Sequence, residues 1–344
     1  MTNQFEILTV YKVDEVGAEG WDQLSAGRPF QSAAWYRFGE RVMADCSPIY
    51  IILMLDKQPV ARGTFWLVRN EPLPVAPILR RVLAALLQRW PLLICRSPLS
   101  NSSGLILPEG RLGALALQKI ADAARLEARR RRCSFLLFDY LNEAETRSGW
   151  PPEYRLVTLS DPGTLMNQKW ASFEEYLQAQ GKKDRQHYKH SRRAAEQAGI
   201  RVERCERVAE VEQALRLIRA VEKEHHSPAN PWIRGLLEAL PMTGGTFMRA
   251  SIADRLVGCG VLVYDGETQL ALALGHAREI PFVYFQLLYA GLQEAFEKRV
   301  RRLRWGSGAY DVKRRLGFEI EHNNQLVVCG SNPFFRGIAS LVKV

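Results

Sequence analysis

The chain has 344 residues, which is enough for two domains of ordinary size, each with its own core. Its hydrophobic share of 47% and charged share of 24% are typical of a soluble globular protein. The net charge of +10 favours a polyanionic partner, meaning nucleic acid, an anionic membrane surface or a phosphate-rich substrate. Six scattered cysteines without a C-x-x-C pair argue against a zinc site and a disulfide framework.

The first half starts without the basic and apolar segments of a signal peptide, so we expect reduced thiols in the cytoplasm. Residues 48–70, "PIYIILMLDKQPVARGTFWLVRN", predict a β-hairpin with a short polar turn. Residues 111–132 predict a helix, and residues 133–140 predict a strand after it.

The stretch 72–100 is apolar, but arginines at 80, 81, 89 and 96 interrupt it. No run reaches the roughly 18 to 20 apolar residues that a membrane-spanning helix needs. The favoured interpretation is a core helix that leads into a buried strand. The other is an interfacial helix, with its arginines and Trp90 at the polar boundary of a bilayer.

The second half repeats this order of elements. Residues 245–266 predict a second hairpin, and the second strand of each hairpin opens with Val-x-x-Gly. Residues 283–299 predict a helix, and residues 300–308 a strand. Hairpin, helix and strand used twice indicate a tandem duplication of one α/β unit. A Pro/Gly turn at 159–170 marks the boundary, so we expect domains at 1–164 and 165–344.

Two helices open the second half. Ser172 and Glu175 form a capping-box pattern that starts a helix at Phe173, and a longer helix ends at Gly199. At helical spacing the longer helix carries five cations on one face, with no acid at i+4 spacing among them: Lys182, Arg185, Lys189, Arg192 and Arg193. The face is either simply solvated or in contact with phosphates.

Known catalytic motifs are absent from the sequence, which contains no G-x-S-x-G, H-E-x-x-H or Walker A pattern. The six histidines are not spaced as metal ligands, and we expect no metal site. His276 ends the strand "QLALALG" and is either a structural histidine, the favoured interpretation, or an acid/base group. Gly306, Ser307 and Gly308 form a tight turn before a helix with Lys313, which suits an anionic oxygen.

The stretch "YDVKRRLGFE" (310–319) resembles the last conserved helix of GCN5-related N-acyltransferases (GNAT), and the hairpin, strand and helix before it follow that family's order. Residues 30–40 and 173–200 resemble the FemAB-like branch more specifically. The resemblance implies two tandem GNAT-like domains of the α/β (α+β) class, each a mixed, mostly antiparallel sheet flanked by helices.

Two positions depart from the GNAT pattern. Lys313 aligns with the family's usual general-acid tyrosine, and "GHAREIPFVYF" replaces the phosphate-cradling Q/R-x-x-G-x-G/A segment. Both departures fit the FemAB-like branch, where a lysine at this position contacts substrate phosphate and the donor can be an aminoacyl-tRNA.

The resemblance therefore implies transfer of an acyl or aminoacyl group to an amine. The donor would be acyl-CoA, an acyl carrier or an aminoacyl-tRNA, with no tightly bound cofactor. The acceptor would be a phosphate-bearing or lipid-linked precursor of the bacterial cell envelope, such as peptidoglycan, or a lipid-like or sugar amine. The enzyme would be cytoplasmic, with peripheral association to the inner face of the membrane. The alternative is a non-catalytic protein that binds RNA or an anionic membrane through a degenerate acyltransferase scaffold.

Residue roles follow from the same resemblance. The expected acid/base or orienting groups are His276, Tyr310 and Asp311. The expected substrate and phosphate contacts are Lys313, Gly306, Ser307, Gly308, Arg185, Lys189, Arg193, Tyr284 and Gln286.

Overall fold

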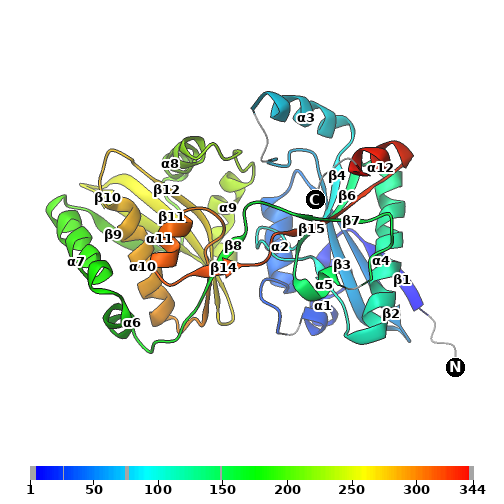
Figure 1. Cartoon of the computed structure of the whole chain (residues 1–344), viewed down its shortest axis with the longest axis horizontal. Coiled ribbons are helices and arrows are strands. Elements are labelled where there is room, and N and C mark those ends of the chain that lie inside the picture. Colours follow the sequence, from blue (N-terminus) through cyan, green and yellow to red (C-terminus); the bar gives the residue numbers. More distant parts are fainter. Residues whose placement is uncertain (1–4, 26, 74–76, 148, 341–344) are drawn as a thin grey trace. The chain divides into compact units, whose positions relative to one another are not determined.

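The chain folds into two compact units in the computed structural model, which describes residues 5–25, 27–73, 77–147 and 149–340 (Figure 1). Unit 1 consists of the described residues of 1–162 and 321–344, and unit 2 consists of residues 163–320. Each unit is one sheet with helices packed against it, so the α/β class with two mixed sheets is confirmed.

Unit 1 contains an eight-stranded sheet in which β1-β2-β3-β4-β6-β15-β7 are neighbours and β5 pairs with β3. Its strands are β1 (Phe5–Val10), β2 (Ser47–Leu55), β3 (Gln58–Val68), β4 (Leu92–Cys95), β5 (Leu105–Ile106), β6 (Phe135–Leu141), β7 (Arg155–Thr158) and β15 (Gln325–Gly330). Its helices are η1 (Val13–Glu15), α1 (Ala18–Ser25), α2 (Ala33–Val42), α3 (Pro77–Arg89), α4 (Gly110–Arg130), α5 (Glu143–Thr146) and α12 (Pro333–Ser340).

The core of unit 1 lies between α4 and the sheet. Alanines and leucines recur along α4 at helical spacing, and their buried face packs on the side chains of β2, β3 and β6. The same sheet carries the fully buried guanidinium of Arg62, which lies 4.1 Å from the ring centroid of Trp21 and donates to the main-chain oxygens of Trp21 and Gln31.

Unit 2 contains a seven-stranded sheet in the order β14-β8-β13-β12-β11-β10-β9. Its strands are β8 (Gly163–Asn167), β9 (Arg201–Cys205), β10 (Thr246–Ile252), β11 (Arg255–Asp265), β12 (Thr268–His276), β13 (Arg302–Arg304) and β14 (Glu319–Glu321). Its helices are α6 (Phe173–Ala179), α7 (Lys182–Gln197), α8 (Val211–Glu224), α9 (Ile233–Ala239), η2 (Leu240–Thr243), α10 (Val283–Glu297) and α11 (Tyr310–Arg315).

The two sheets have the same topology, which confirms the duplication. The unit 1 series β1-β2-β3-β4-β6-β15-β7 corresponds strand by strand to β9-β10-β11-β12-β13-β8-β14 in unit 2. In both, the first three neighbouring pairs are antiparallel, the fourth (β4–β6, β12–β13) is parallel, and the fifth is antiparallel. The two hairpin turns also match, because Asp56–Lys57 and Ala253–Asp254 all have positive φ, as two-residue turns of type I′ require.

The units exchange equivalent strands. After β7 the chain enters unit 2, where β8 pairs with β13, and after β14 it returns to unit 1, where β15 pairs with β6. The expected boundary at 164 is close to the observed one at 162, but the expectation that the second domain extends to residue 344 is wrong. Residues from 321 onwards belong to unit 1 because the edge of β6 needs an antiparallel partner, which the first half does not supply.

Local expectations for the second half are largely confirmed. The Ser172 hydroxyl accepts a hydrogen bond from the Glu175 main-chain nitrogen at 3.1 Å, so α6 begins as expected. The Glu175 carboxylate reaches one residue further back than a capping box requires and accepts from the Ala171 nitrogen at 2.9 Å. The strand expected at 300–308 is confined to three residues, because the chain turns away after Arg304.

Gly275 sets how closely α8 approaches the end of β12. A Cβ atom at Gly275 would lie 2.5 Å from the main-chain nitrogen of Ile218, and a helix backbone cannot yield as a side chain can. We expect Gly275→Ala to lower the free energy of unfolding by about 1–3 kcal/mol through overpacking. The matched control is Gly260→Ala in β11, where the nearest atom to a Cβ is 3.7 Å away. That variant should be neutral or stabilised by up to about 1 kcal/mol in denaturant titration. Equal stability of the two variants would contradict this account.

Candidate active site

The parallel strands β12 and β13 separate early. They pair only from Thr268–Arg302 to Leu270–Arg304, although β12 continues to His276. Ala271–Leu274 are therefore partly exposed, whereas the three preceding residues of the same strand are buried. Beyond Leu270, the N–H and C=O groups on this edge of β12 no longer pair with β13. Such an edge can bind an extended ligand or a carbonyl oxygen.

The corresponding place in unit 1 is filled by an ion-pair network. Cys95–Phe138 is the last pair of β4 and β6, and Arg96 and Asp139 follow it directly. Arg96 donates two hydrogen bonds to Glu71 at 2.7 and 2.8 Å and lies 3.8 Å from Asp139. All three side chains are at most 14% exposed, and burial raises the pKa of Asp139 to about 6. Unit 2 has Ala271 and Trp305 at these positions, so its strand edge is the better candidate for substrate.

Lys313 holds the turn that ends β13. Its side chain is buried, and its ammonium donates to the carbonyl oxygens of Trp305 (2.5 Å), Gly306 (3.1 Å) and Ser307 (3.1 Å). Burial lowers the pKa of Lys313 to about 8, so the ammonium form prevails at neutral pH. An ammonium has three protons, and here all three are engaged. The structure thus argues against our expectation that Lys313 binds a substrate phosphate, and assigns it a positioning role.

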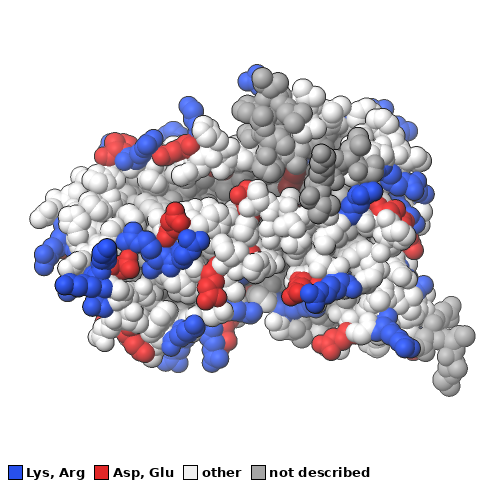
Figure 2. All heavy atoms as spheres, in the orientation of Figure 1, with Lys and Arg blue, Asp and Glu red and all other residues white. Residues whose placement is uncertain are grey.

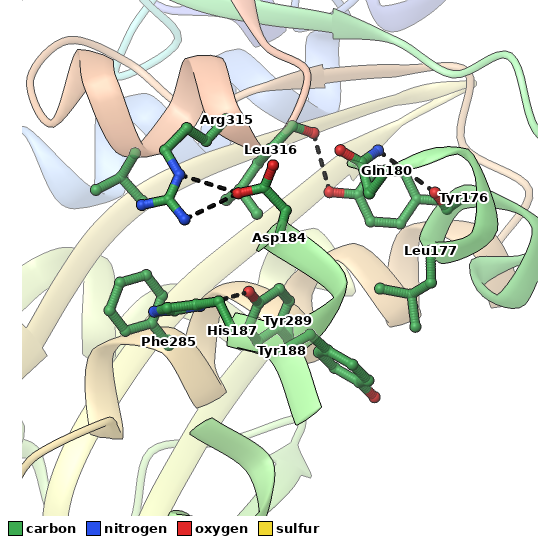
Figure 3. A pocket seen from close by; sticks show the side chains of 11 residues that line it. Tyr176, Leu177, Gln180, Asp184, His187, Tyr188, Phe285, Tyr289, Arg315 and Leu316 are labelled. Atoms are coloured by element: carbon green, nitrogen blue, oxygen red, sulfur yellow. Dashed lines mark hydrogen bonds and ion pairs between the residues drawn. The ribbon is translucent and has the colours of Figure 1, made fainter. Parts of the chain in front are cut away.

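A pocket lies between α10 and α11 on one side and α6 and α7 on the other (Figure 3). Its walls are mostly aromatic and aliphatic, from Tyr176, Leu177, Gln180, Asp184, His187, Tyr188, Phe285, Tyr289, Val312, Arg315 and Leu316. Tyr188, Phe285 and Val312 belong to the same apolar cluster as Ala271 and Leu274 of β12. The pocket and the unpaired strand edge thus adjoin one hydrophobic cluster.

His187 and Tyr289 form a hydrogen-bonded pair in this pocket, with 3.2 Å between Nδ1 and the phenol oxygen (Figure 3). The ring of Phe285 stands edge-on to the imidazole at 4.4 Å. Burial lowers the pKa of His187, with the Arg315 charge as a further cause, so the imidazole is neutral at pH 7. Burial raises the pKa of Tyr289 to about 12, so the phenol keeps its proton. A neutral imidazole beside a protonated phenol can accept one proton and donate another.

An ion pair borders the same pocket. Asp184 of α7 accepts hydrogen bonds from Nε (3.0 Å) and Nη2 (2.8 Å) of Arg315 in α11. The Arg315 side chain is 53% exposed, so it remains accessible to a solvent-borne anion. Asp184 and His187 are three residues apart and share one face of α7. We did not identify either from the sequence, where the i, i+3 spacing of an acid and a histidine was the available indication.

The expected acid/base residues do not meet in one place. His276 lies at the end of β12 beside Tyr284, with 5.5 Å between ring centroids, and burial lowers the pKa of His276. Tyr310 instead lines a separate hollow with Thr164, Arg314 and Phe318. Asp311 is 96% exposed and pairs with Arg314 at 3.3 Å, so this carboxylate is a surface group.

The expected substrate contacts also divide into different roles. Arg185 donates to the carbonyl oxygens of Gln178 and Gln180, so it caps the C-terminus of α6. Gln286 donates to the Ser191 carbonyl at 3.2 Å and thereby joins α10 to α7. Lys189 and Arg193 are exposed on α7.

A basic band covers α7 and α11 on one face of unit 2 (Figure 2). It consists of the exposed side chains of Lys182, Arg185, Lys189, Arg192, Arg193, Arg314 and Arg315. The expectation that no acid relieves the cations of α7 is wrong, because Glu196 accepts from Nε of Arg192 at 3.1 Å. The band nevertheless keeps a cationic excess next to the pocket.

Lys313→Met should reveal the positioning role as a loss of stability. The substitution keeps most of the stem volume and removes the Nζ donor from three carbonyl oxygens, of which that of Gly306 still accepts from the Thr164 hydroxyl at 2.8 Å. We therefore expect the free energy of unfolding to fall by about 1–3 kcal/mol. Arg314→Met, on the exposed side of the same helix, should change it by no more than about 0.5 kcal/mol. Chemical denaturation measures both. An unchanged stability together with weaker binding of an anionic ligand would instead restore the phosphate role.

Comparisons with known proteins agree with this geometry. Residues 182–314 match the family model described as an acetyltransferase (GNAT) domain. No curated protein matches the sequence. The crystal structure of FemX aligns with a TM-score of 0.62 at 10% identity, over 97% of this chain and 99% of FemX.

Two further structures have the same fold over nearly their whole length. A tandem GNAT protein from the clavulanic acid biosynthesis pathway aligns with a TM-score of 0.56 at 13% identity, over 96% of this chain and 99% of its own. The C-terminal domain of a protein assigned as a lysylphosphatidylglycerol synthetase in Agrobacterium fabrum aligns with a TM-score of 0.55 at 11% identity, over 94% of both chains. Residues 182–314 therefore contain a GNAT acetyltransferase domain, and the chain as a whole has the fold of FemX and of a tandem GNAT protein.

Proposed function

We propose that unit 2 transfers an aminoacyl group from an aminoacyl-tRNA to an amine, with the reacting groups in the pocket that α6, α7, α10 and α11 line. The observation that carries the proposal is the His187–Tyr289 pair, which lies in an aromatic pocket bordered by a cationic surface. A polyanionic donor and a proton-accepting group are what such a transfer requires.

The reaction is an acyl substitution. The neutral amine attacks the donor's ester carbonyl, the new C–N bond forms, and the C–O bond to the terminal ribose breaks. His187 accepts the proton that the amine loses, and Tyr289 donates its proton to the leaving oxygen. The imidazolium then returns its proton to the phenolate, so the pair is restored. N–H groups on the unpaired edge of β12 would stabilise the oxyanion.

The basic band supports tRNA as the donor. Seven exposed cations on two helices extend over more surface than one diphosphate can neutralise. Within the band, Lys189 and Arg193 would contact backbone phosphates of the tRNA. The turn at Gly306–Gly308 would offer main-chain amides at the start of α11 to a further phosphate. His276 and Tyr284, at the other end of the unpaired edge, are assigned to orienting the acceptor.

A second candidate donor is an acyl thioester such as acyl-CoA. The match of residues 182–314 to an acetyltransferase domain favours it, as does the partly exposed edge of β12, along which an extended donor arm can lie. We propose an amine of a cell-envelope or lipid-linked compound as the acceptor. The likeness to a lysylphosphatidylglycerol synthetase supports this choice.

The pH dependence of turnover tests the role of His187. Activity should rise with pH through the depressed pKa of His187 and level off above about 6.5, because only the neutral imidazole accepts a proton. His187→Gln should lose about 10²–10⁴-fold in kcat and also lose this pH limb. His276→Gln should keep the limb and change mainly KM. If His187→Gln retains the profile while His276→Gln abolishes it, the base is His276.

Donor binding tests the basic band. We expect Lys189→Glu combined with Arg193→Glu to weaken the binding of aminoacyl-tRNA at least tenfold and to reduce its dependence on salt. The control is Lys223→Glu, an exposed lysine on α8, which should bind like the wild type. Filter binding and calorimetry with tRNA and acyl-CoA distinguish the donors. Tight binding of tRNA without turnover of any aminoacyl or acyl donor would favour the non-catalytic alternative.

A further inference from the structure

Helix α3 of unit 1 exposes a stripe of large apolar side chains. Val82, Leu86 and Trp90 are 53%, 43% and 38% exposed. Trp90 directly follows the last helical residue, and the spacing of four residues places all three side chains on one side of α3. Leu87, which lies about 100° around the helix from Leu86, is only 6% exposed. The helix is thus not the core helix that we favoured from the sequence, because only one side of it packs on the protein. Its first side chains, at 77–80, and residues 74–76 lie outside this description.

A second stripe lies on α12. Phe334 is 70% exposed and Ile338 is 39% exposed, again four residues apart. The ring of Phe335 lies 6.2 Å from Trp90 and 5.4 Å from Phe135, so it joins α12 to the end of α3 and to β6. Both helices lie at the same end of unit 1 (Figure 1). We call Val82, Leu86, Trp90, Phe334 and Ile338 the apolar patch.

Four consecutive arginines, Arg129–Arg132, are exposed beside the apolar patch. Hydrogen bonds fix their place, because Arg129 donates to the Ser331 carbonyl at 3.1 Å and Ser134 donates to the Trp90 carbonyl at 3.1 Å. Arg81 and Arg89 flank the stripe of α3. Segments 77–100, 128–138 and 322–344 contain no Asp or Glu. Glu127, which pairs with Arg130 at 2.8 Å, is nearly buried, so the surface around the patch is strongly cationic.

We propose that the apolar patch and its arginines bind the surface of an anionic lipid bilayer. Aliphatic side chains enter the acyl boundary, the Trp90 ring takes the interfacial position, and the arginines contact lipid phosphates. The positive charge around the apolar patch favours an anionic bilayer over the other possible partners. A second copy docking by a two-fold axis would place arginine against arginine, and RNA would leave the aliphatic stripes without a contact. No helix in the described ranges is long and apolar enough to cross a membrane, so the mode of attachment proposed here is peripheral.

This inference concerns unit 1 and is independent of the transfer reaction proposed for unit 2. If both hold, the chain works at the bilayer surface, where lipid-linked amines are presented. Binding to vesicles and acyl transfer are measured separately, so either proposal can fail without the other.

Co-sedimentation of the full chain with vesicles is the test. Wild-type protein should bind vesicles of phosphatidylglycerol and phosphatidylcholine at least tenfold more tightly than pure phosphatidylcholine vesicles, and 0.5 M salt should weaken this binding. Leu86→Ser with Phe334→Ser should reduce binding at least tenfold. The control is Met242→Ser, which alters a 53% exposed apolar residue of unit 2 and should have no effect. Arg89→Gln with Arg132→Gln should remove the preference for the anionic lipid.

Several outcomes would overturn the proposal. One is wild-type protein that does not sediment with phosphatidylglycerol vesicles. A second is sedimentation that survives the Leu86/Phe334 substitutions, since binding would then be purely electrostatic. A third is a change of oligomeric state in that double variant, measured by light scattering, which would assign the patch to a second copy. A fourth is a loss of RNA binding in the arginine variant with vesicle binding unchanged.

Discussion

A buried ammonium determines the shape of the candidate site. Lys313 binds the carbonyl oxygens of Trp305, Gly306 and Ser307, and this contact fixes the turn that takes the chain away from β12 after three residue pairs. The early end of β13 leaves the edge of β12 partly exposed, and it starts α11 where Val312, Arg315 and Leu316 can line the pocket. A lysine that must remain protonated in the interior pays for its desolvation only if every proton has an acceptor, which is the case here.

The duplicated units show how one topology can be open in one copy and closed in the other. Both place a parallel strand pair at the middle of the sheet, and both end that pair after three residues. Arg96 and Asp139 then bridge the strand ends in unit 1, with Glu71 balancing the guanidinium, whereas Ala271 and Trp305 leave the edge accessible in unit 2. The charged pair Arg96–Asp139 thus closes the strand ends in unit 1, and the uncharged pair Ala271 and Trp305 leaves them accessible to a substrate in unit 2.

The placement of β15 makes unit 1 depend on a segment of the chain that lies beyond unit 2. Unit 1 takes its sixth strand, β15, from the part of the chain that follows unit 2, so the edge of β6 is paired only after that part has returned. Unit 2 is continuous from residue 163 to 320 and contains its own sixth strand, β8. This arrangement explains why a boundary drawn on composition alone misplaces residues 321–344. A Pro/Gly turn reports where the chain leaves a unit, but it carries no information about a later return.

The sequence by itself determined the local elements and the duplication, because these depend on short-range patterns: β-branched residues around two-residue turns, the Ser172 cap of α6, and the apolar period of α4 and α10. It also indicated the cationic face of α7. The tertiary structure decided which side chains share a site. Asp184, His187, Tyr289 and Arg315 come from three helices and meet only when α7 and α11 pack beside α10. Lys313, expected to face solvent and phosphate, turns inward because three strand-end carbonyls lie within its reach. Spacing along a chain fixes the face of a helix, but only packing decides what that face meets.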